Sequence, residues 1–246
     1  MRWLRRIVQP EPDRLSVASA GPPIVVHLRR RDTAKRMTLR VSSATGEVAL
    51  TLPPRADLRT AQRFLDGQAN WIATRLARRP ERLPFVPGAV IPLRDEPHLI
   101  GHRPGERGRT RVVRMEGGPP EIVVGGDVEA VPGRVRRFLM AEAQQDLSAA
   151  VRRHAGRLGV PFGRLTLRDT RSRWGSCSST GALSFSWRLI LAPAEVLDYL
   201  AAHEVAHLKE MNHSPAFWRV LRDLCPATDS AEAWLKRNGT GLHRFG

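Results

Sequence analysis

Apolar and polar residues alternate over much of the first half of the chain, and this two-residue period predicts strands. Residues 23–31, 36–42 and 47–53 combine β-branched runs with alternation. The sequence SATG at 43–46 is typical of a turn, so we expect the second and third of these segments to form a hairpin. Shorter strands are expected near 96–103, 109–114 and 120–124, where Gly and Pro residues separate the apolar runs.

A helical period replaces the alternation in two places before residue 160. The first helix is expected over residues 57–79, with Asp57 as its N-cap. The second begins around the sequence VPG at 131–133 and stops at Gly159. A proline-rich connection at 78–88 and a soft boundary near residue 130 divide the chain into a strand-rich region with one helix, residues 1–130, and a second domain, residues 131–246.

The second domain continues with a mixed pattern of strands and helices. Residues 164–169, 173–178 and 182–192 are typical of strands, the last two joined by a turn at 179–181. Pro193 suits the first turn of a helix, and residues 194–211 contain strong helix formers with no internal Gly or Pro. These patterns together indicate the α+β class.

This last predicted helix carries a candidate metal site, within the sequence AAHEVAHLKEMNHSPAFW. His203 and His207 are four residues apart, so they share one helix face and can reach one ion about 2 Å from each nitrogen. Glu204 follows His203 on the helix and is placed beside a water bound to that ion, not among the ligands. This arrangement is the chemical basis of the H-E-x-x-H motif. A catalytic zinc needs a third ligand. Seven residues of straight helix rise about 10 Å, which makes Glu210 a poor third ligand.

His213 is the better third ligand, provided that the helix ends near Met211 and the chain turns back. Asn212 tolerates the left-handed conformation that ends many helices. Ser214 and Pro215 form a suitable N-cap and first-turn pair for a following helix. The sequence therefore predicts a corner between two helices that holds His213 over the other two imidazoles.

Composition adds a possible partner and a location. The formal net charge of +16 attracts polyanions, which suggests an association with nucleic acid, although an arginine-rich composition also follows from a GC-rich genome. No apolar run approaches the roughly 20 residues that cross a bilayer, and the basic N-terminus lacks an apolar signal core. We therefore expect no membrane association and a cytoplasmic protein.

Residues 169–218 resemble the YgjP-like metallopeptidase family. The resemblance is carried by an R-x-R-W-G-S-C strand, a W-R-L-I segment, the H-E-x-x-H motif and the sequence N-H-S-x-x-F-W. The family is similar to SprT-like and gluzincin-type zinc proteases. The resemblance implies a compact zincin-like metallopeptidase domain, with His203, His207 and His213 as Zn²⁺ ligands and Glu204 as the catalytic residue.

The expected reaction is hydrolysis of a peptide bond in a protein or peptide substrate, by a zinc-bound water that Glu204 activates. Arg173, Trp174 and Tyr199 are candidates for substrate binding. Arg173 and Trp174 lie in the R-x-R-W-G-S-C segment, which could form an edge strand and pair with an extended peptide. Tyr199 precedes His203 by four residues, so it lies on the same helix face. Further candidates to assist at the oxyanion are His243 and Arg244. Two alternatives stay open: a metal-dependent nucleotide phosphohydrolase, and a nucleic-acid-binding module with structural zinc.

Overall fold

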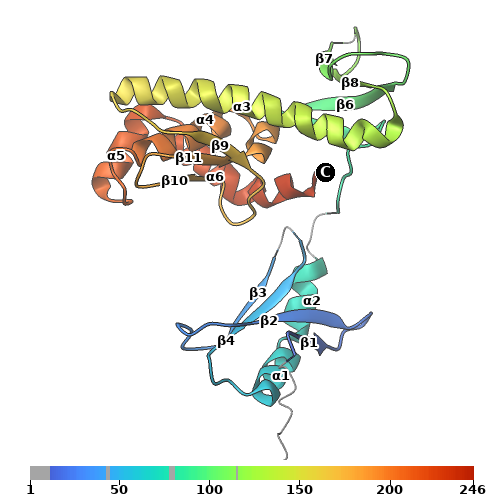
Figure 1. The fold of residues 1–246 in the computed structure, drawn as a ribbon, viewed down its shortest axis with the longest axis vertical. Coiled ribbons are helices and arrows are strands. Elements are labelled where there is room, and N and C mark those ends of the chain that lie inside the picture. Colours follow the sequence, from blue (N-terminus) through green and yellow to red (C-terminus); the bar gives the residue numbers. More distant parts are fainter. Residues whose placement is uncertain (1–11, 43–44, 78–80, 115) are drawn as a thin grey trace, which may run out of the picture. The chain divides into compact units, whose positions relative to one another are not determined.

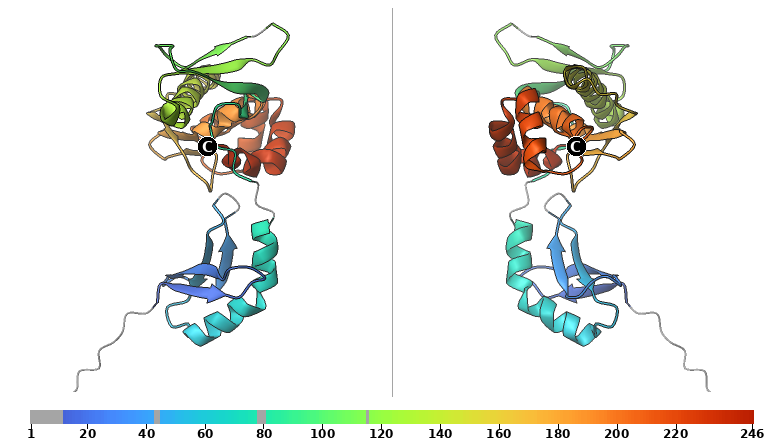
Figure 2. Two further views of the ribbon diagram at one scale, coloured as in Figure 1. Left: turned by 90° about the vertical axis from the view of Figure 1, so that its right-hand side faces the viewer. Right: turned by 90° about the vertical axis from the view of Figure 1, so that its left-hand side faces the viewer.

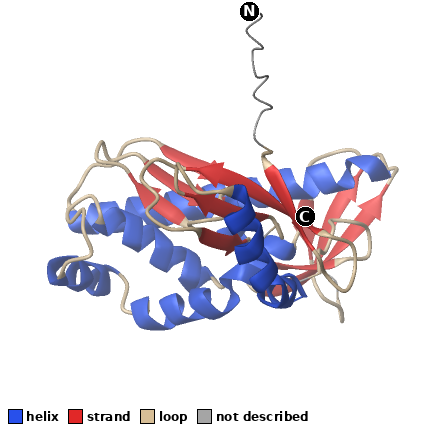
Figure 3. Ribbon diagram, turned by 90° about the horizontal axis from the view of Figure 1, so that it is seen from below, coloured by secondary structure: helices blue, strands red, loops and turns tan. Residues whose placement is uncertain are grey.

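The computed structural model describes residues 12–42, 45–77, 81–114 and 116–246. The chain separates into two compact units, Met1–Pro80 and Glu81–Gly246 (Figure 1). Both units contain helices as well as small sheets, which confirms the α+β class (Figure 3). None of the helices described is both long enough and apolar enough to cross a membrane.

The first unit is a four-stranded sheet with two helices. In spatial order the strands are β1 (Arg14–Val17), β2 (Ile24–Arg30), β4 (Val48–Leu52) and β3 (Thr38–Val41). β3 and β4 form the predicted antiparallel hairpin. The helices are α1 (Leu58–Gly67) and α2 (Ala69–Ala77). Alternate residues of β4 are buried in a small core with Leu65 and Ile72.

The one helix expected over residues 57–79 is instead two helices, and its last two residues lie outside the described part of the chain. Asp57 caps α1 as predicted, because its Oδ2 accepts a 3.0 Å hydrogen bond from the Thr60 N–H. The break falls at Gln68, directly after Gly67. Glycine weakens a helix interior because it loses the most backbone entropy on ordering.

The second unit contains two small sheets and four helices. One sheet has the order β5 (Val90–Leu93), β6 (Glu96–Arg103), β8 (Glu121–Gly125), β7 (Arg111–Val113), and the other has the order β10 (Gly175–Cys177), β11 (Leu183–Ser186), β9 (Leu165–Arg168). The helices are α3 (Val131–Leu158), α4 (Ala194–Ala206), α5 (Pro215–Leu224) and α6 (Thr228–Asn238), with short 3-10 helices at Val128–Ala130, Trp187–Leu191 and Gly239–Arg244. Gly159 ends α3 with φ +68°, as its position predicted.

The boundary between the units lies after Pro80, whereas the sequence suggested a boundary near residue 130. The strands of residues 90–125 bury apolar residues such as Ile91, Ile100 and Ile122 in the same core as α3 and α4. β8 packs on the N-terminal part of α3 (Figure 1, Figure 2). A sheet with one apolar face must bury that face against another element. Here the covering element is α3, which lies beyond the expected boundary in the sequence.

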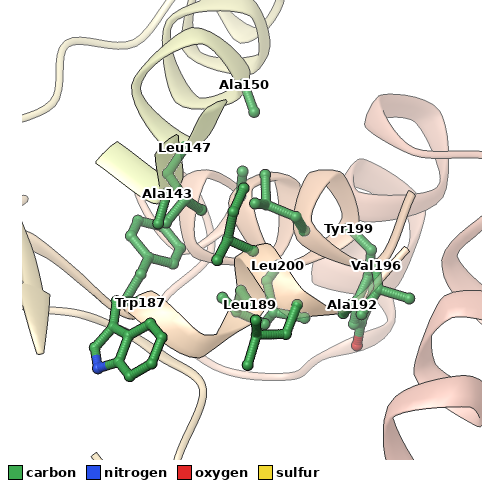
Figure 4. Packing of buried hydrophobic residues seen from close by; sticks show 14 of the residues in the cluster. Ala143, Leu147, Ala150, Trp187, Leu189, Ala192, Val196, Tyr199 and Leu200 are labelled. Atoms are coloured by element: carbon green, nitrogen blue, oxygen red, sulfur yellow. The ribbon is translucent and has the colours of Figure 1, made fainter. Parts of the chain in front are cut away.

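The core of the second unit fixes α4, the helix that carries the candidate site. Ala143, Leu147 and Ala150 of α3 belong to the same buried core as Val196 and Leu200 of α4 (Figure 4). The segment 187–191, expected to continue a strand, is a fully buried 3-10 helix that completes this core. Four of its five residues are apolar and the fifth, Arg188, is also buried, and such a run does not distinguish a strand from a buried helical turn.

Candidate metal centre

The last turn of α4 positions two of the three predicted histidines. His203 lies in the helix, and His207 is its C-cap residue, with its N–H donating to the His203 carbonyl at 3.3 Å. The centroids of their rings are 5.0 Å apart. The four-residue spacing therefore brings both imidazoles to one side of α4.

The chain returns to α4 through a tighter corner than the sequence suggested. α4 ends at Ala206, not near Met211, and the Leu208 and Lys209 amides continue it as a tightened turn by bonding carbonyls three residues back. Asn212 does not adopt the left-handed conformation, since the non-glycine residues described with positive φ are Arg94 and Asp95. The corner is made by turns in the ordinary backbone region.

The start of α5 fixes His213, as predicted. Ser214 is the N-cap of α5, and its Oγ accepts a hydrogen bond from the Phe217 N–H at 3.3 Å. Pro215 follows in the first turn, where its fixed φ suits a helix. His213 directly precedes this capped start, so its backbone position is set by α5.

The three imidazoles converge on one point. One ligand atom from each of His203, His207 and His213 lies within 4.8 Å of the other two, and the Nε2 atoms of His203 and His213 are 3.2 Å apart. Ligands about 2.0–2.1 Å from a tetrahedral zinc ion are separated by roughly 3.3 Å. The separation of these two atoms therefore fits a metal ion held between them.

Neighbouring groups orient the rings of this histidine cluster (His203, His207 and His213). The Nδ1 of His207 lies 3.1 Å from the Glu210 carbonyl, which requires a proton on Nδ1 and leaves Nε2 as the free acceptor for a metal. Phe217 is fully buried and packs against all three imidazoles, with ring centroids 4.5–5.0 Å away. This supporting contact becomes visible only in three dimensions.

Burial keeps two of the three imidazoles neutral. It lowers the pKa of His203 to about 4, assisted by the nearby His207 and His213. Burial also lowers the pKa of His207, against the opposing effect of its bond to the Glu210 carbonyl. Neutral imidazoles have a free lone pair for a metal, so these two ligands are available at neutral pH.

Glu204 is a buried carboxyl group beside the cluster. Only 4% of the residue is exposed, and burial raises its pKa to about 7, although the charge of Arg173 acts in the opposite direction. A Cβ atom placed on Gly175 would lie 2.4 Å from Glu204 Oε1. The absence of a side chain at Gly175 therefore lets β10 pack directly on this carboxyl group, a constraint that the sequence analysis missed.

The three candidate substrate-binding residues have different environments in the structure. Arg173 is exposed, and its charge acts to lower the pKa of Glu204 against the effect of burial. Trp174 stacks on His243, with ring centroids 5.0 Å apart and an interplanar angle of 25°. Tyr199 is 4% exposed, and its ring approaches His203 edge-on at 5.9 Å while packing in the core (Figure 4).

Other titratable side chains considered at the site serve the packing. Asp198 on α4 accepts a 2.7 Å hydrogen bond from His154 Nε2 on α3 and pairs with Arg153. Burial, together with the charge of Glu204, raises the pKa of Cys177, which disfavours the thiolate needed by a nucleophile. Neither residue belongs to the histidine cluster.

Comparison with known proteins agrees with the sequence motifs. The model of a family described as YgjP-like, metallopeptidase domain, matches residues 35–238. No curated protein matches the chain.

Two solved structures show a limited likeness. The metallopeptidase zymogen of Pyrococcus abyssi abylysin is 23% identical, with a TM-score of 0.35 over 40% of this chain and 97% of that chain. The metallopeptidase zymogen of Methanocaldococcus jannaschii jannalysin is 20% identical, with a TM-score of 0.34 over 37% of this chain and 94% of that chain.

Proposed function

The chain belongs to the YgjP-like metallopeptidase family, and we propose that it hydrolyses peptide bonds at a zinc ion held by His203, His207 and His213, with Glu204 as the general base. The observation that carries the proposal is the convergence of three imidazole nitrogens beside a buried carboxyl group. Borderline-soft Zn²⁺ suits imidazole ligands, and three protein ligands leave one position open for water or substrate.

The donor set supports zinc through its protonation as well as its geometry. His203 and His207 are neutral at pH 7, and the Glu210 carbonyl fixes the tautomer of His207. Structural zinc sites usually have four protein ligands, whereas the group found among the described residues has three. A catalytic role therefore fits the site better than a structural one.

Glu204 performs the proton transfers in the proposed reaction. Zinc, when bound, supplies an acidified water and polarises the carbonyl group of the substrate. Glu204 accepts a proton from the water as its oxygen bonds to the carbonyl carbon, and then delivers that proton to the leaving nitrogen as the C–N bond breaks. The buried position of Glu204 suits this role, because a pKa near neutrality favours both accepting and releasing a proton.

β10 is a candidate binding site for an extended peptide. It is an edge strand of the three-stranded sheet and pairs with β11 on one side. Gly175 of β10 lies against Glu204, and Arg173 lies two residues before Gly175 in the sequence. We infer that a substrate segment adds to this edge by backbone hydrogen bonds, which places its carbonyl groups near Glu204 and the guanidinium of Arg173.

Replacement of Glu204 by Gln tests the proposal. Purified protein should contain about one zinc per chain, measured by elemental analysis. Glu204→Gln should retain the metal and lower kcat/KM on an unfolded protein substrate by about 10²–10⁴-fold, since the amide cannot accept the proton. The matched control is Glu210→Gln, because the contact of Glu210 with the cluster is through its backbone carbonyl. Full activity of the Glu204 variant would show that the general-base assignment is wrong.

The same preparations address the phosphohydrolase alternative. Nucleoside triphosphates can be offered in place of the protein substrate, with phosphate release as the measurement. If the protein hydrolyses nucleotides in a Glu204-dependent manner and hydrolyses no peptide bond, the site is that of a phosphohydrolase and not of a peptidase.

A further inference from the structure

A second surface of the Glu81–Gly246 unit gathers arginines that the proposed reaction does not use. A hollow of about 470 Å³ lies between the segment before β7 and one face of α3. Its lining residues are Gly108, Arg109, Thr110, Arg134, Arg137, Phe138 and Ala141. We refer to this site as the arginine hollow.

The helical spacing explains why the α3 residues meet there. Positions 134, 137, 138 and 141 follow the spacing i, i+3, i+4 and i+7, so they share one face of α3, while Val135 and Leu139 face the core. Arg157, near the other end of α3, binds the carbonyls of Asp223 and Leu224 at the end of α5. Because 23 residues of helix rise about 35 Å, the arginine hollow is far from that end of α3.

The arginines of the hollow lack acidic partners, unlike their neighbours. In the adjoining hollow, Arg94 pairs with Glu142 and Asp146, and Arg114 pairs with Glu96. Within the described ranges no ion pair is formed by Arg109, Arg134 or Arg137. Three guanidinium groups around one concave site therefore have unused hydrogen-bond donors and uncompensated charge.

Two glycines hold the hollow in shape. A Cβ atom on Gly125 would lie 2.1 Å from the Glu106 carbonyl oxygen, so the loop before β7 packs directly on this glycine. Gly126, with φ +78°, lies beneath the guanidinium of Arg134, whose Nη2 would be 2.9 Å from an added Cβ. The carbonyl of Gly126 is fixed by the Nε2 of His102 at 2.6 Å. The guanidinium of the half-buried Arg134 therefore packs on a backbone segment that is held in place.

We propose that the arginine hollow binds the phosphates of single-stranded nucleic acid, with a base on the ring of Phe138. Guanidinium groups pair with phosphate oxygens in a bidentate manner, and aromatic rings stack on unpaired bases of any sequence. Phe138 is half-buried and lines the hollow. An unpaired base can stack on such a ring, whereas a base held within a duplex is already stacked between its neighbours. The combination of arginines and an aromatic ring favours nucleic acid over an acidic peptide, because Asp and Glu side chains have no aromatic ring to stack on Phe138. The net charge of +16 assists the encounter.

Binding of a fluorescein-labelled 20-nucleotide single strand, followed by anisotropy at 50 and 200 mM salt, tests the proposal. The triple variant Arg109→Gln, Arg134→Gln, Arg137→Gln should raise Kd at least about tenfold at 50 mM salt. It should also reduce the salt slope by about 2, since each phosphate contact on a single strand contributes about 0.7. The matched control is Arg152→Gln, Arg164→Gln, Arg237→Gln, which removes equal charge from exposed positions of the same unit. Thermal unfolding of both variants checks that they are folded.

Three further measurements make the assignment specific. Phe138→Leu keeps an apolar side chain but removes the aromatic ring, and should weaken oligonucleotide binding several-fold while leaving competition by inorganic phosphate unchanged. Equal weakening by the two triple variants would show a diffuse field instead of a site, and overturn the proposal. A poly-glutamate that competes as tightly as the oligonucleotide, unaffected by Phe138→Leu, would assign the hollow to an acidic peptide and overturn it too. These outcomes do not depend on peptide hydrolysis, so they are independent of the proposed function.

Discussion

The histidine cluster and the arginine hollow are two polar sites in one compact unit, and they are built in opposite ways. The cluster comes from eleven consecutive positions, packs on the buried ring of Phe217, and contains imidazoles that burial keeps neutral. The hollow combines residues 108–110 with one face of α3, and its arginines stay charged near solvent. A metal site needs unprotonated nitrogens at fixed separations, whereas a polyanion site needs accessible charge. The two environments differ accordingly.

Removal of a metal ligand should have the largest effect and should leave the arginine hollow untouched. We expect His207→Ala to lose the bound metal and to lower kcat/KM by on the order of 10³-fold or more, because two imidazoles do not hold a catalytic zinc. Metal content and peptide hydrolysis are the measurements. Oligonucleotide affinity should stay within about twofold of wild type, since the phosphate contacts lie elsewhere. A parallel loss of both functions would contradict the separation of the two sites.

A methyl group on Gly175 should damage catalysis without removing the metal. The Cβ of Gly175→Ala would lie 2.4 Å from Glu204 Oε1, so the carboxyl group must move, and a displacement of this kind costs about 10²-fold in kcat/KM. The matched control is Gly156→Ala on α3, where nothing lies within 4 Å and alanine should stabilise the helix by about 0.5–1 kcal/mol. Wild-type activity of the Gly175 variant would mean that Glu204 tolerates displacement or takes no part in the reaction.

The corresponding change in the arginine hollow should have a smaller effect. Gly126→Ala places a Cβ 2.9 Å from the Arg134 guanidinium and should weaken oligonucleotide binding about three- to tenfold, the loss of one phosphate contact. Gly117→Ala is the control, because its φ of +75° imposes similar strain of about 1–3 kcal/mol with nothing within 4 Å. Both variants should unfold at similarly lowered temperatures, and only the first should bind the oligonucleotide less well. Equal affinities would remove Arg134 from the proposed site.

The smallest effect concerns the ion pair that joins α3 to α4. Burial raises the pKa of Asp198, but the hydrogen bond and charge of His154, with the charge of Arg153, outweigh it, so the pKa is lowered overall. A lowered carboxyl pKa stabilises the fold above its unfolded value, about 3.9, and that contribution is lost as the pH falls through the folded value. Metal-free Asp198→Asn should therefore unfold at a lower temperature at pH 6, and the difference from wild type should shrink below about pH 4. A constant difference from pH 3 to 7, followed by circular dichroism, would exclude this linkage.

Motifs made of neighbouring residues were predicted most reliably. The β3–β4 hairpin, the caps at Asp57 and Ser214 and the stop at Gly159 all follow from local turn and cap chemistry. Predictions that depend on packing were less accurate. The strand expected over 182–192 ends at Ser186 because the apolar residues after it are buried as a 3-10 helix. The sequence suggested a boundary near residue 130, and the two compact units divide after Pro80, because α3 covers the sheet that precedes it.

The sequence by itself determined which residues form the candidate metal site, since a helical period of 3.6 residues places His203 and His207 on one face and a Ser–Pro pair starts a new helix just after His213. Only the tertiary structure decided that α4 ends early enough for the three rings to meet, that Phe217 supports them and that Gly175 lies against Glu204. Periodicity and capping act over a few residues and are written in the local sequence. Burial and close approach depend on segments far apart in the chain, and their positions are set only when the whole core packs.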